Sequence, residues 1–231
     1  MNFFRHVSSF EQLTATPFEG ENNAIGWDRK LQGDFNELIE SLRGKEYLQN
    51  INEEDLLELE LSDQGQIARS IILDDLKLLL SIGASPSINV IGSYEKDTRL
   101  KSISTDVYSF HKDQSTVPTD TYLCTYYGAG SEILPNFMAQ KKVFIPEVID
   151  EIKTLYTGPA EGFEEFLKDE FFDLHYLAKP SATIFELGVG HMWRLAVEYP
   201  GCEVEACIHR APPSSKNCFR LRSEERRVGK E

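Results

Sequence analysis

The sequence has little of what membrane, secreted or nucleic-acid-binding proteins need. No stretch of the 231 residues approaches the roughly 18 apolar residues of a membrane span, and the first ten residues carry charge too early for a signal peptide. Basic residues are outnumbered 24 to 38 by acidic ones, giving a net charge of −14, which argues against binding to a phosphate backbone. We therefore expect a cytoplasmic protein that binds neither nucleic acid nor a membrane.

Cysteine is also scarce. The four cysteines show neither Cys-x-x-Cys spacing nor the density of a secreted disulfide scaffold. They are Cys124, Cys202, Cys207 and Cys218. Most are expected to be small buried hydrophobic residues.

A composition of 41% hydrophobic and 27% charged residues is typical of a globular domain, and the length suits one domain better than two. The last ten residues, RSEERRVGKE (222–231), are the one basic segment of the chain. They look like the translation of a common sequencing adapter, so we treat them as foreign and exclude them from fold reasoning. The expected domain is 1–221, with the native C-terminus missing.

The first third of the chain is predicted to be mainly helical. In GDFNELIESLRG (33–44), apolar residues recur at helical spacing between Asp34, a candidate N-cap, and Gly44. The run 62–86 repeats this pattern more strongly and ends at Gly83 and Pro86. We expect 1–86 to form a helical layer.

From Ser87 onwards the period changes to that of strands. Short segments rich in β-branched and aromatic residues, such as SINVIGS and TYLCTYYGAGS, are bounded by Gly, Asp and Ser. Two amphipathic segments near 144–175 predict a helical insertion that carries its phenylalanines towards the core. The prediction is an α+β protein, an antiparallel double-stranded β-helix of the cupin or jelly-roll type, with β core 87–221 and helices outside.

One segment raises a definite chemical question. In YSFHKDQS (108–115), His111 and Asp113 point to the same face if the segment is a strand, because the side-chain period is two. A histidine nitrogen and a carboxylate at this spacing can bind one divalent cation. The alternative is an ordinary polar pair at a strand end.

A third ligand is available in CEVEACIHR (202–210), where His209 ends a predicted strand. Two histidines and one carboxylate form the facial triad of non-haem iron(II) sites, which leaves positions open for water, cosubstrate or oxygen. Cys207 shares a predicted face with His209, and a thiolate near the ion would favour zinc instead.

Four further residues complete the candidate site. Arg220, eleven residues beyond His209, lies where a basic residue of double-stranded β-helix oxygenases binds the distal carboxylate of 2-oxoglutarate. Tyr126 and Arg210 are candidates for the pocket wall. Glu132 is a candidate hydrogen-bond partner for a ligating histidine. The TYYGAG segment is predicted to be a tight hairpin.

Several blocks together resemble a family of bacterial proteins, the domain of unknown function numbered 1826. They are FHKD, LCTYYGAGSEIL, IHRAPP, FRLR and, upstream, NNAIGWDRKL. The chain departs from the pattern at Ser131, Ile133 and Ala211, and GHMWRLAV stands where a Lys-Gly-Glu block is usual. The resemblance implies a fold and a metal-binding constellation, without a reaction.

The leading hypothesis is a cytoplasmic cupin-like domain that binds one divalent metal, iron(II) or zinc, through His111, Asp113 and His209. Its more specific form is an iron(II)- and 2-oxoglutarate-dependent oxygenase. The alternatives are a non-catalytic zinc-binding or metal-handling protein and a metal-free interaction module. The substrate and the oligomeric state do not follow from the sequence.

Overall fold

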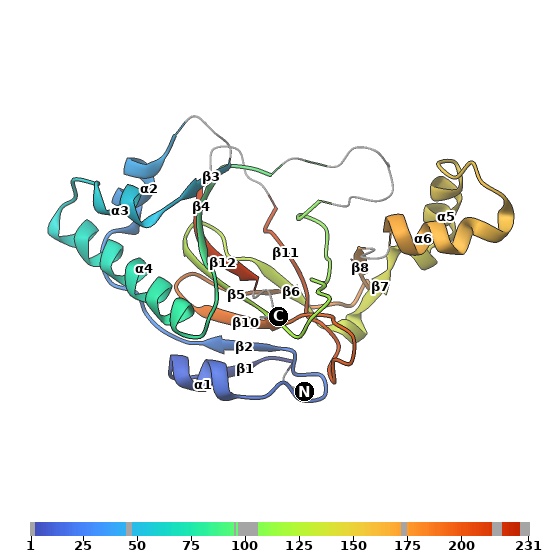
Figure 1. Cartoon of the computed structure of the whole chain (residues 1–231), viewed down its shortest axis with the longest axis horizontal. Coiled ribbons are helices and arrows are strands. Elements are labelled where there is room, and N and C mark those ends of the chain that lie inside the picture. The colour runs from blue at the N-terminus through green and yellow to red at the C-terminus, as the bar shows by residue number, and fades with distance from the viewer. Residues whose placement is uncertain are drawn as a thin grey trace.

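The computed structural model describes residues 3–44, 48–94, 96, 106–171, 175–213 and 219–226. The protein is a mixed α/β structure built around a large, mostly antiparallel sheet with helices on one face (Figure 1). Among the helices of these described ranges, none is long and apolar enough to cross a membrane.

The large sheet has the strand order β1-β2-β10-β5-β12-β4-β3, and only the β1–β2 pair is parallel. Its strands are β1 (Arg5–Val7), β2 (Ala24–Trp27), β3 (Leu48–Ile51), β4 (Ser87–Ile91), β5 (Asp120–Tyr127), β10 (Met192–Ala196) and β12 (Arg220–Arg226). Strands from both ends of the sequence are therefore neighbours, and β5 lies near the centre.

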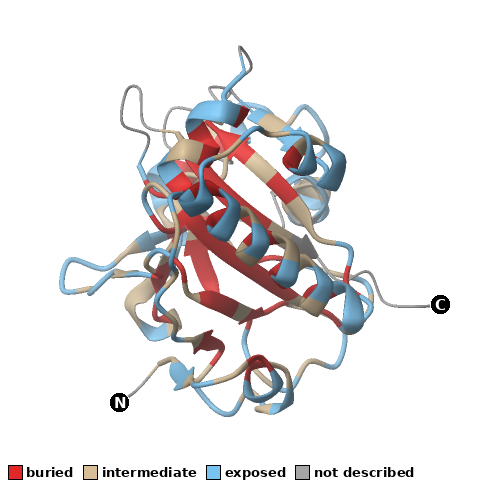
Figure 2. Cartoon of the chain, turned by 90° about the vertical axis from the view of Figure 1, so that its left-hand side faces the viewer, coloured by how far each residue is buried: buried red, intermediate tan, exposed pale blue. Residues whose placement is uncertain are grey.

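Four helices cover the outer face of this sheet. They are α1 (Phe10–Ala15), α2 (Phe35–Leu42), α3 (Glu53–Leu57) and α4 (Asp63–Ser81). As predicted, Asp34 caps α2, its side chain accepting a hydrogen bond from the Glu37 amide, and α4 stops before Gly83, whose φ is 79°. Figure 2 shows the buried strands beneath these helices.

The inner face of the large sheet packs against a second, three-stranded sheet. This sheet has the order β11-β6-β9, with β6 (Glu132–Leu134), β9 (Phe185–Glu186) and β11 (Ile208–Arg210). The apolar layer between the two sheets includes Leu123 and Trp193 from the large sheet and Ile133 from the small one. The protein thus has one core on each face of the large sheet.

The helical insertion is present as α5 (Pro146–Lys153) and α6 (Phe163–Phe171), reached through the strand pair β7 (Ala139–Lys141) and β8 (Tyr176–Ala178). Its aromatic residues do not reach the main core as predicted. Phe163 and Phe166 pack with Val148 and Ile152 in a separate cluster, at the end of the molecule away from α2–α4 (Figure 1). The side chains of Phe171 and Phe172 lie outside the described set.

The first third is mainly helical, and it also contributes the strands β1, β2 and β3 to the large sheet. One further prediction about the β structure needs correction. The segment after Tyr127 is not a hairpin, because β5 and β6 belong to different sheets. Gly128 has φ 86°, and a Cβ there would lie 2.6 Å from the carbonyl oxygen of Phe219, so glycine permits the close approach of β12.

The tail predicted to be foreign begins inside β12. Arg222 is buried, forms an ion pair with Glu224 of the same strand, and its Nε lacks a hydrogen-bond partner among the described residues. The foreign origin of 222–231 stays a prediction.

Candidate metal centre

The segment that contains His111 and Asp113 is extended, although it forms isolated bridges rather than the predicted regular strand. His111 pairs with His209 of β11, each donating its amide to the carbonyl of the other over 2.9 Å. Two residues on, the carbonyl of Asp113 accepts a hydrogen bond from the Glu198 amide. Backbone pairing thus fixes the segment on both sides of the site.

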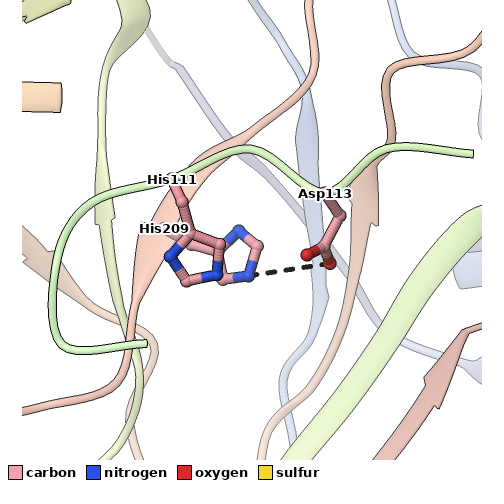
Figure 3. A group of neighbouring side chains, drawn as sticks. All are labelled: His111, Asp113 and His209. Atoms are coloured by element: carbon pink, nitrogen blue, oxygen red, sulfur yellow. Dashed lines mark ion pairs between the residues drawn. The ribbon is translucent and has the colours of Figure 1, made fainter. Parts of the chain in front are cut away.

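The three predicted ligands come together. One ligand atom from each of His111, Asp113 and His209 lies within 4.8 Å of the other two, close enough to bind one metal ion. The His209 Nε2 and Asp113 Oδ2 atoms are 3.7 Å apart, and the two imidazole centroids 4.6 Å (Figure 3). Among the described residues, no other group of three His, Cys, Asp or Glu side chains has this geometry.

Backbone carbonyls orient both histidines. Nδ1 of His111 lies 2.8 Å from the carbonyl oxygen of Ser109, and Nδ1 of His209 lies 3.2 Å from that of Cys207. A carbonyl can only accept, so Nδ1 carries a proton in each ring, and in the neutral tautomer Nε2 then offers its lone pair. Ligating histidines in metalloproteins usually donate the other ring N–H in this way.

The environment keeps His111 neutral and orients Asp113. Burial, with the neighbouring His209 as a second cause, lowers the pKa of His111 to about 3, so its ring is neutral at physiological pH. Thr121 of β5 donates its hydroxyl to Asp113 Oδ2 over 2.7 Å and thereby orients the carboxylate. Asp113 and His209 are both buried.

Tyr126 does not line the site, so its predicted role as a pocket residue is wrong. Tyr126 and Cys124 do share a face of β5, but it is the face covered by helices. The Tyr126 hydroxyl donates to Asp75 of α4, and its ring stacks on Phe35. The residues of β5 that face inwards are instead Thr121, Leu123 and Thr125, which alternate with them.

Glu132 and Cys207 also have roles other than those predicted. Glu132 accepts a hydrogen bond from Arg210 over 2.6 Å rather than from a histidine. The Cys207 thiol lies in the apolar layer between the sheets, and its burial raises its pKa. Cys207 contributes its backbone carbonyl, which accepts from His209. Among the described residues, no thiol belongs to the ligand group, so the thiolate that would have favoured zinc is not found there.

Arg220 is buried at the start of β12. Its Nε donates to the carbonyl of Ala129 over 2.7 Å, and its Nη2 lies 3.3 Å from Ser131 Oγ. Burial lowers its pKa to about 10, and the guanidinium of Arg222 adds to the effect. No carboxylate of the described ranges forms an ion pair with it.

Three residues near the site had escaped sequence reasoning. Thr121 belongs to no motif. The only sequence signal for its role is the alternation of β5, which puts it on the same face as Leu123 and Thr125. His175, at the end of the segment predicted to form the helical insertion, is buried after α6 with its ring centroid 5.6 Å from that of His111. Lys142 is buried and donates to Ser109 Oγ over 2.8 Å.

Comparisons with protein families, with curated proteins and with solved structures found no match to this chain. The site is therefore interpreted from its own geometry.

Proposed function

We propose that the protein binds one divalent metal ion through His111, Asp113 and His209 and acts as an iron(II)- and 2-oxoglutarate-dependent oxygenase. The observation that carries the metal site is the convergence of three ligand atoms, with both histidines turned by carbonyls so that Nε2 is free. In this proposal the two packed sheets form a double-stranded β-helix, and the chain is related to the bacterial family named above.

The donor set supports iron. Two imidazoles and one carboxylate with no thiolate suit iron(II) and leave three positions of an octahedral ion open. Zinc also accepts these ligands, so a non-catalytic zinc protein is the second candidate, favoured by the depth at which Asp113 and His209 are buried.

Arg220 supports the keto acid. A buried guanidinium without a carboxylate partner among the described residues is costly, and an anionic ligand would supply the missing charge. The planar guanidinium can donate two parallel hydrogen bonds to one carboxylate. In this reaction class, O₂ gives one atom to 2-oxoglutarate, which yields succinate and CO₂, and the other to the substrate; the metal supplies the activation of O₂.

Metal analysis after anaerobic purification tests the proposal. We expect about one iron per chain and oxygen uptake that requires 2-oxoglutarate. Zinc without turnover would establish the binding protein instead, and a chain without metal would refute both, leaving the metal-free interaction module.

Three variants test the site. His209→Ala should abolish metal retention, whereas His191→Ala, a partly exposed histidine 3.4 Å from Asp28, should retain it. Arg220→Gln should keep the metal and raise the 2-oxoglutarate concentration needed for half-maximal uptake by at least about tenfold. Unchanged metal content in His209→Ala would remove His209 from the site.

A further inference from the structure

A cavity of about 580 Å³ lies beside the metal centre, a volume typical of small-molecule sites. Its lining is of two kinds. The apolar and aromatic part includes Phe110, Tyr176, Leu177 and Ile184, and the last two are exposed. The polar part includes Ser109, Lys142, Asp106 and Arg210.

Lys142 is the unusual member of this lining. Only 6% of its surface is exposed, and its Nζ makes one hydrogen bond, to Ser109 Oγ over 2.8 Å, among the described residues. No carboxylate of those residues lies within ion-pair distance. Burial lowers its pKa, and the charge of Asp106 opposes this effect. An ammonium has three donors, and one of them has an acceptor among the described residues.

The lining as a whole is cationic on balance, with Lys96, Lys142 and Arg210 against Asp106. Arg210 pairs with Glu132 through Nε, and its guanidinium lies 4.2 Å from the Phe110 ring centroid. Lys96 stands at the rim, its Nζ 5.9 Å from the Tyr108 ring. Asp106 is the single acidic residue in the described lining. A positive cavity in a chain with a net charge of −14 selects for an anion.

We propose that this cavity binds a small organic carboxylate with an apolar body, and that Lys142 holds the carboxylate while Phe110 and Tyr176 pack against the body. Ser109 connects the cavity to the metal centre, since its Oγ accepts from Lys142 and its carbonyl accepts from Nδ1 of His111. The bound carboxylate is the substrate of the oxygenase; this last step rests on the proposed function.

The test is a calorimetric titration of the metal-free, full-length protein with 3-phenylpropionate and with its uncharged amide, 3-phenylpropionamide. We expect the amide to bind at least about tenfold more weakly, because it cannot pair with the ammonium. Lys142→Gln should weaken carboxylate binding to the level of the amide. Lys141→Gln, the same change at the exposed neighbour outside the cavity, should leave binding unchanged.

Lys142→Arg keeps the positive charge and serves as the control for misfolding. It should still bind the carboxylate more tightly than the amide. Equal affinity for the two probes, no binding of either, or wild-type affinity in Lys142→Gln would overturn the inference. Zinc titration distinguishes it from the proposed function. Lys142→Gln should bind zinc normally, and His209→Ala should lose zinc but keep the carboxylate.

Discussion

The substitution Tyr126→Phe tests whether Tyr126 belongs to the core beneath the helices rather than to the metal site. The sequence placed Tyr126 in the pocket, whereas the structure places its ring against Phe35 and its hydroxyl on Asp75, across the sheet from the metal ligands. The substitution removes one oxygen and leaves the ring in place. We therefore expect it to lower stability and to leave metal affinity unchanged.

The size of the loss follows from the contacts of Asp75. The Tyr126 hydroxyl donates to Asp75 Oδ2 over 2.8 Å, and Arg29 binds the same carboxylate with both terminal nitrogens. A hydrogen bond to a charged group contributes about 1.5–3 kcal/mol. Because Asp75 keeps its ion pair with Arg29, we expect a loss of about 1.5–2 kcal/mol in the free energy of unfolding. Urea denaturation measures this loss directly.

Tyr127→Phe is the matched control. The Tyr127 hydroxyl donates to Asn36 over 2.9 Å in an exposed setting, so its loss should cost no more than about 0.5 kcal/mol. Zinc affinity, measured by competition with a chelator, should stay within about twofold of wild type in both variants. Equal destabilisation of the two variants, or weaker zinc binding in Tyr126→Phe alone, would refute the placement of Tyr126.

Three further predictions concern other parts of the structure. Thr121→Val should weaken metal binding about tenfold in the chelator assay, because Asp113 loses the hydroxyl that orients it; Thr125→Val, the same change on the same face of β5, should not. Lys142→Met should raise the melting temperature at pH 7. Since the folded pKa of Lys142 lies below the unfolded value of about 10.4, wild-type stability rises with pH across that interval, and the gain should shrink towards pH 10. Asp34→Ala should cost about 1 kcal/mol in urea denaturation, through loss of the α2 cap.

Local patterns predicted the long helices and the central strands well. Asp34 caps α2, and Gly83 follows the end of α4 with a positive φ. Both effects depend only on residues close together in the chain, so the sequence alone predicts them. The strands β1, β2 and β3 were missed because each has only three or four residues. In β2, Ala24, Ile25 and Gly26 are all buried, so no alternation marks it as a strand.

The metal ligands were predictable and their surroundings were not. Parity puts His111 and Asp113 on one face, and the bridge from His111 to His209 brings in the third ligand. Parity also groups Tyr126 with Cys124, but β5 is buried on both faces, so the pattern cannot say which face meets the metal. The contact between Lys142 and Ser109 joins segments 33 residues apart and leaves no local signal.

Two buried cationic side chains stand out in this acidic chain. The chain has a net charge of −14, yet Lys142 and Arg220 are buried without an ion-pair partner among the described residues. Burial lowers the pKa of both groups, which means that each disfavours its own charge in the folded protein. An anionic ligand would relieve this cost, and a divalent ion bound by His111, Asp113 and His209 would add further positive charge, since only one of these ligands is a carboxylate. The acidic surface repels the same anions during their approach. Added salt should therefore speed their association by screening the surface, while contacts inside the buried site are screened much less.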